Sequence, residues 1–204
     1  MKINLINLTL LTSLSTIAMA ANIALPPATG QASTVPNGCS SSECYNSPAG
    51  SDGTLKQGVA WPTPRFAVDT TGNCIIDKLT GLMWVRNLNS VNGGNGLNWT
   101  NALNITESGT WCGYSDWRTP NVVELRSLVN YGESSTSVWL NTPISSGGGG
   151  FINVNVNLGV YWTSSLYANT STIRTINLLN GSITTSSSIT TPPTILLFPV
   201  RGGM

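Results

Sequence analysis

The sequence contains no histidine, and only 8% of its residues are charged. Histidine is a common general base and zinc ligand, so its absence argues against histidine-dependent catalysis and against a zinc site. No long apolar run follows residue 20, so we expect no membrane insertion of the mature chain. No dense acidic loop is present either. Asp69 and Asp77 are close in sequence, which leaves calcium as a narrower alternative to a protein without cofactors.

The first twenty residues have the features of a cleaved signal peptide. Lys2 precedes a short apolar stretch, and Ala18–Ala20 form a small-x-small cleavage site. We therefore expect export to the periplasm, the cell surface or the extracellular space. Because Ala21 rather than cysteine follows the cleavage site, we expect no lipid anchor.

The charge balance excludes two classes of partner. Nine basic residues fall to eight when Lys2 is removed with the leader, against eight acidic residues. Nucleic acids and anionic membranes are both bound through clusters of basic side chains. We therefore expect neither as a partner, and strong binding to sulfated polymers is disfavoured for the same reason.

The four cysteines are expected to form disulfides, because the chain is exported. Three pairings are open, and we favour Cys39–Cys44 together with Cys74–Cys112. A metal site is the competing interpretation, but the spacing lacks paired C-x-x-C units.

Composition divides the chain into three parts. Residues 1–20 are the signal peptide, and residues 21–60 are rich in Pro, Gly, Ser and Ala, which predicts an extended N-terminal arm. The folded domain is expected to occupy residues 61–204.

Local patterns predict an α+β domain. Residues 73–86 indicate a hairpin, and residues 99–103 a short helix. Asn121 and Glu124 have capping-box spacing at the start of a second helix, which we expect to end at Gly132. A polar loop is expected over 132–150. Strands are then expected at 151–157, 159–165, 172–179, 182–188 and 194–203, with a hairpin turn at Asn180-Gly181.

Six short motifs follow one another along the chain: TGLMW at 80–84, WxxA at 99–102, GYSDWRTPNVVELRSLV at 113–129, YWTSS at 161–165, NGS at 180–182 and PVRGG at 199–203. In order and spacing they resemble the collagen-like-adhesin (Lcl) C-terminal domain family, over roughly residues 66–203. Thr119 stands where family members usually have Leu. The resemblance implies a C-type-lectin-like fold, with small antiparallel sheets, two helices and long loops. It also implies a secreted or surface protein that binds ligands in adhesion.

Asp116 and Arg118 stand on either side of a tryptophan, just before the predicted helix. The aromatic residues of segment 111–117 are expected to desolvate both charges, and buried charges persist when they are paired. The two residues either pair with each other or pair with Arg201 and Glu124. No histidine and no obvious second carboxylate accompany them, so we interpret them as structural rather than catalytic.

The tryptophans divide into two groups. We expect Trp84, Trp117 and Trp162 in the core, because they lie in strand motifs or beside the charged pair. Trp139 lies in the predicted polar loop, where it is either an exposed aromatic platform or a satellite core contact.

Polar and aromatic residues of the late strands provide the candidate ligand-binding site. The candidates are Trp139, Tyr167, Asn169, Arg174 and Asn177. Amides and hydroxyls beside aromatic rings suit recognition of sugar hydroxyls. We therefore expect a binding module for a glycan or another cell-surface ligand.

Two other functions are alternatives to the binding module. The first is a structural or tip subunit of a surface appendage, or a protein-binding module. The second is an enzyme of the formylglycine-generating type, whose chemistry needs a reactive cysteine pair late in the domain. All four cysteines lie at or before Cys112, so we expect no enzyme.

Overall fold

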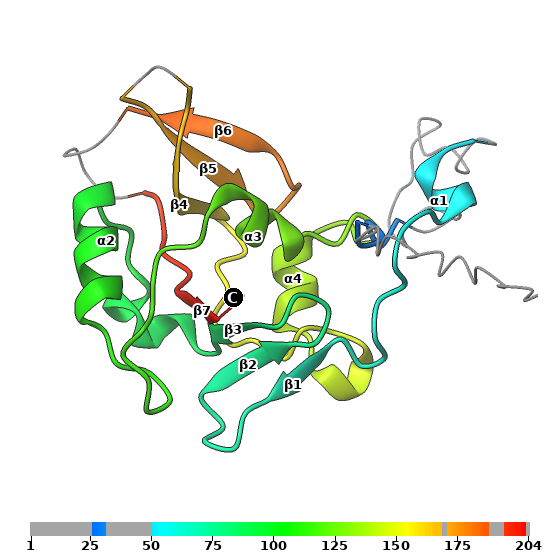
Figure 1. Cartoon of the computed structure of the whole chain (residues 1–204), viewed down its shortest axis with the longest axis horizontal. Coiled ribbons are helices and arrows are strands. Elements are labelled where there is room, and N and C mark those ends of the chain that lie inside the picture. Colours follow the sequence, from blue (N-terminus) through cyan, green and yellow to red (C-terminus); the bar gives the residue numbers. More distant parts are fainter. Residues whose placement is uncertain (1–25, 32–49, 169–170, 188–193, 203–204) are drawn as a thin grey trace, which may run out of the picture.

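The computed structural model describes residues 26–31, 50–168, 171–187 and 194–202. They form an α+β domain with two antiparallel sheets (Figure 1). The first sheet has the order β1-β2-β3-β7, with strands at Phe66–Val68, Cys74–Asp77, Leu82–Val85 and Val200–Gly202. The second has the order β4-β5-β6, with strands at Val160–Leu166, Ile173–Asn177 and Ile183–Ser186.

The helices are short. The α-helices are α1 (Asp52–Leu55), α2 (Trp99–Ser108), α3 (Val122–Ser127) and α4 (Thr136–Asn141), and the 3-10 turns are η1 (Leu88–Ser90), η2 (Asn92–Gly94) and η3 (Ile144–Ser146). The predicted signal peptide and the predicted Cys39–Cys44 pair lie outside the described residues.

The predicted hairpin at 73–86 is confirmed. Strands β2 and β3 pair antiparallel, with Ile75 opposite Trp84. The turn between them is closed by the Gly81 N–H, which donates to the Asp77 carbonyl at 2.8 Å. Gly81 has a φ of 73°, a left-handed conformation that glycine adopts at little cost.

The capping box of α3 is also confirmed. The Asn121 side chain accepts from the N–H groups of Val123 and Glu124, and the Glu124 carboxylate accepts from the Asn121 N–H. The end of this helix was predicted wrongly. It ends at Ser127, because the Leu128 and Val129 N–H groups turn to the Leu125 and Arg126 carbonyls in a tighter final turn.

Three later predictions need correction. Segment 132–150 contains α4 and η3 rather than only a loop. Segment 151–157 forms no strand, and only Ile152 makes a bridge, to Asn87. Of the predicted strand 194–203, only Val200–Gly202 is a strand, while Leu196 makes an isolated bridge to Tyr161.

The core lies between the two sheets, with α3 and α4 between them in the view of Figure 1. Leu125 and Leu128 pack with Ile75 of the first sheet and Ile176 of the second in one buried cluster. A second cluster joins β4, α2 and the segment around Cys74. The sheets are therefore held by shared side chains rather than by strand pairing.

Part of the predicted N-terminal arm packs on the domain. Pro27 forms a parallel bridge with Val59, and the Ala28 carbonyl accepts from the Trp61 indole N–H at 2.7 Å. The Thr29 hydroxyl donates to the Asp52 carboxylate. Within the described residues, no helix is long and apolar enough to span a membrane.

Candidate functional site

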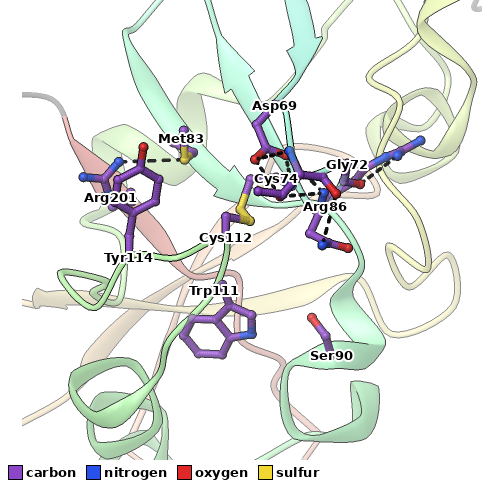
Figure 2. The surroundings of a disulfide bond; sticks show 12 residues. Asp69, Gly72, Cys74, Met83, Arg86, Ser90, Trp111, Cys112, Tyr114 and Arg201 are labelled. Carbon is purple, nitrogen blue, oxygen red and sulfur yellow. Dashed lines mark hydrogen bonds between the residues drawn. A yellow bond between two sulfur atoms is a disulfide. The ribbon is translucent and has the colours of Figure 1, made fainter.

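The Cys74–Cys112 disulfide confirms the favoured pairing of these two cysteines, with the Cα atoms 6.3 Å apart. It ties β2 to the turn that precedes α3 (Figure 2). Trp111 and Tyr114 close this turn through two backbone hydrogen bonds, and the Trp117 indole N–H donates to both of their carbonyls. The segment is therefore fixed covalently and by its own backbone.

Asp116 pairs with Arg201, not with Arg118. Both carboxylate oxygens accept from Arg201, at 2.7 and 3.1 Å, and the guanidinium lies 3.6 Å from the centre of the Tyr114 ring. The hydrogen bond from Arg201 lowers the pKa of Asp116. The expected desolvation is wrong here, because 58% of the Asp116 side chain is exposed.

Arg118 pairs with Glu124, the capping residue of α3. Two guanidinium nitrogens donate to its two carboxylate oxygens, each at 2.7 Å, and one also donates to the Gly202 carbonyl at 3.0 Å. Burial alone would raise the pKa of Glu124, but the bonds from Arg118 and the Asn121 N–H bring it below its ordinary value. Arg118 therefore joins the start of α3 to β7, a structural role.

Three of the four tryptophans considered from the sequence are core residues by burial: Trp84, Trp117 and Trp162 are at most 3% exposed. The interpretation of Trp139 as an exposed platform is wrong. It is 8% exposed in α4, contacts Trp61 and Phe66, and donates to the Gly147 carbonyl. Because the apolar side of α4 packs on the core, the side chain of Trp139 is buried there.

A buried ion pair between Arg65 and Asp77 was missed by sequence reasoning. Arg65 Nε and Nη2 donate to the two Asp77 oxygens at 2.9 and 2.6 Å, and the side chains are 3% and 0% exposed. The guanidinium also lies 4.5 Å from the Trp61 ring centre. The sequence contained only half of the signal, because Asp77 begins the turn of the predicted hairpin, whereas Arg65 precedes β1, a strand that was not predicted.

Asp69 and Asp77, the residues considered for calcium, are both occupied by protein donors. Asp69 accepts from the Thr71 hydroxyl and from the backbone N–H groups of Thr71, Asn73 and Cys74. Burial raises the pKa of Asp69, but these hydrogen bonds lower it overall. Asp77 holds Arg65. In the part of the chain that the structure describes, no group of three or more His, Cys, Asp or Glu side chains could hold a metal.

The second sheet brings two of the candidate ligand-binding residues together. The Arg174 guanidinium lies 4.9 Å from the centre of the Tyr167 ring, which is 45% exposed. Asn177 lies at the other end of β5, and its side chain accepts from the Leu179 N–H in the hairpin turn. Asn169 lies outside the described residues. The structure thus joins Tyr167 with Arg174 and separates Asn177 and Trp139 from them.

An apolar groove lies beside α3, with a volume of about 380 Å³. Segment 26–29, Trp61 and α3 line it, and Ile183 at the start of β6 forms part of its wall. Val123 is 73% exposed in this groove, and Arg126 is the single charged residue among its lining. The groove therefore adjoins the outer strand of the second sheet.

Comparison with known proteins gives one match. The Lcl C-terminal domain model matches residues 73–201. This range contains α2, α3, α4 and every strand except β1 and the last residue of β7. No curated protein and no solved structure matches the chain. The matched region covers more than half of the sequence, and the chain belongs to the Lcl C-terminal domain family.

Proposed function

We propose that the chain is an exported binding module that recognises a glycan or another cell-surface ligand at the surface of Tyr167 and Arg174. The observation that carries this proposal is the stacked pair itself. An exposed phenol ring offers an apolar face for a sugar ring, and a guanidinium offers planar hydrogen-bond donors.

The residues around the pair support binding of a polar, uncharged ligand. Arg174 is the single charged residue between Glu133 and Arg201 in the sequence. None of the ion pairs among the described residues includes it. Thr185 lies opposite Arg174 in the β5–β6 register and is exposed, so a hydroxyl adjoins the guanidinium. The guanidinium N–H groups of Arg174 are thus available to a ligand without competition from an acidic residue.

The family membership and the disulfide support the wider proposal. The family implies a C-type-lectin-like fold, and a disulfide is typical of exported chains. We propose that the signal peptide directs the chain to the periplasm, the cell surface or the extracellular space. We also propose that it acts without catalysis and without a cofactor. The two described cysteines are bonded to each other, and Asp69 and Asp77 already hold protein donors.

The test is a glycan-array screen of residues 21–204, run with calcium and with a chelator. We expect binding to a defined sugar set in both buffers, weakened about tenfold by Tyr167→Ala or Arg174→Ala. Tyr114→Ala is the matched control, because Tyr114 is also exposed and its ring also contacts an arginine, Arg201. We expect it to leave binding unchanged.

The other outcomes are equally informative. Loss of binding in chelator would overturn calcium-independent recognition. Full binding by the Tyr167 and Arg174 variants would show that the ligand binds elsewhere on the chain. Absence of binding to every glycan would favour a protein partner on the cell surface, to be sought with the same variants.

A further inference from the structure

Among the described residues, no strand pairs with the outer edge of β6. β6 is the last strand of its sheet, whereas the outer side of β4 is bridged by Leu196 and that of β7 by Arg118. β1, the remaining edge strand, has three residues and is followed at once by the charged Asp69. β6 is therefore the edge with the least protection in the described part of the chain.

The hydrogen-bond pattern shows which groups face outward. The Asn177 N–H donates to the Ser182 carbonyl, and the Arg174 carbonyl faces β4, where it accepts from the side-chain hydroxyl of Thr163. In an antiparallel sheet, hydrogen-bonded and non-hydrogen-bonded pairs alternate. Thr175 and Thr184 therefore bond to each other, while the N–H and C=O groups of Ile183 and Thr185 point away from β5. Within the described residues, no strand pairs with these groups.

The composition of β6 favours pairing rather than preventing it. Edge strands are commonly protected by lysine, proline or a bulge, and β6 has none of these in its sequence Ile-Thr-Thr-Ser. Its β-branched residues suit a strand. Ile183, 36% exposed, also lines the apolar groove together with Val123. A partner that covers the groove would bury apolar surface in addition to pairing with the four-residue strand.

We propose that β6 is a dimerisation edge, where two copies of the chain pair their β6 strands antiparallel about a two-fold axis. The outward residues fit this symmetry, because Ile183 of each copy faces Thr185 of the other when the axis passes Thr184. Identical strands repel each other when like charges meet, but β6 has no charge. A second copy is thus a partner with matching backbone groups and no electrostatic penalty.

The dimer has a consequence for ligand binding, which rests on the proposed function. Pairing of the two β6 strands joins the β4-β5-β6 sheets of the two copies into one continuous sheet. Because the two-fold axis is normal to this sheet, the same face of each copy lies on the same side of it. Arg174 and Thr185 are opposite each other in the register, so both Tyr167–Arg174 surfaces lie on that side. Two sites on one face bind a multivalent surface more tightly than one site does.

The test measures the mass of residues 21–204 by size-exclusion chromatography with light scattering, over a wide range of concentration. We expect the mass to double with rising concentration. Thr185→Pro removes an outward N–H from both copies, and Thr185→Lys places a charge at the edge. Each variant is expected to weaken the dimer about thirtyfold. Thr100→Lys, an exposed threonine on α2, is the control and should dimerise like the wild type.

Several results would overturn the dimer. These are a wild type that stays monomeric at every concentration, or a Thr185→Lys variant that dimerises like the wild type. If Thr185→Pro unfolds, as seen by circular dichroism, Thr185→Lys alone decides. Binding of the wild type to a soluble monovalent sugar should be equal below and above the concentration at which the mass doubles, so failure of the dimer is distinguishable from failure of the ligand site.

Discussion

At the scale of single residues, burial of the Arg65–Asp77 pair carries a desolvation cost, because both charges are removed from water. Asp77 is fully buried and also accepts from the Leu79 N–H and the Thr80 hydroxyl. The sequence alone predicted the core positions of Trp84, Trp117 and Trp162 and the Cys74–Cys112 bridge, but not this ion pair. The contact depends on the register that places Phe66 opposite Asp77, and strand register is not set by either residue alone.

Removing Arg65 should therefore be costly. We expect Arg65→Met to lower the free energy of unfolding by about 3–5 kcal/mol, because it leaves the Asp77 carboxylate buried without its cation. Urea denaturation measures the change. Arg126→Met, at an exposed arginine of α3, should cost less than about 1 kcal/mol. Equal costs at both positions would show that the buried pair contributes little.

At the scale of elements, prediction succeeded where the signal is local. The α3 capping box and the Asn180-Gly181 hairpin are determined by residues within four positions of each other. Helix α4 was missed because Ser135, Thr136 and Ser137 resemble a polar loop, whereas burial of Trp139 and Leu140 determines its structure. Segment 151–157 alternates like a strand but has no partner strand, and Asn153 has a φ of 59°. Alternation indicates a strand only where a neighbour exists to pair with it.

Helix α3 should make stability depend on pH through Glu124. Its pKa lies below the ordinary 4.5 in the folded chain, so the ionised form stabilises the fold above that pH. This stabilisation is lost as the pH falls through the folded-state pKa. Glu124→Gln keeps the capping box but cannot titrate. We expect it to be less stable than wild type by up to about 1 kcal/mol at neutral pH, with the difference shrinking as the pH falls through the folded-state pKa of Glu124.

Denaturation at a series of pH values measures this difference. Glu107→Gln is the control, because Glu107 is exposed on α2 and belongs to no ion pair among the described residues. Its profile should follow that of the wild type. A Glu124→Gln variant whose deficit persists unchanged in acid would assign the loss to packing rather than to ionisation.

At the scale of the whole molecule, the Cys74–Cys112 bridge limits how far the two halves of the domain can separate on unfolding. It closes a segment with a sequence separation of 38, which contains β3, α2 and both of the 3-10 turns between them. In the chain-entropy account, such a loop contributes about 4 kcal/mol. We therefore expect Cys74→Ala/Cys112→Ala to lose about that amount in urea denaturation.

Dithiothreitol separates this bridge from the predicted Cys39–Cys44 pair. Reduction should destabilise the wild type about as much as the double substitution does, because the same long loop is released in both cases. It should have little further effect on the double variant if Cys39–Cys44 closes only a small loop in the arm. A large additional loss on reduction of the double variant would mean that the arm cysteines stabilise the fold. The arm would then be part of the cooperative unit, as the contacts of Pro27, Ala28 and Thr29 with the domain already suggest for its described portion.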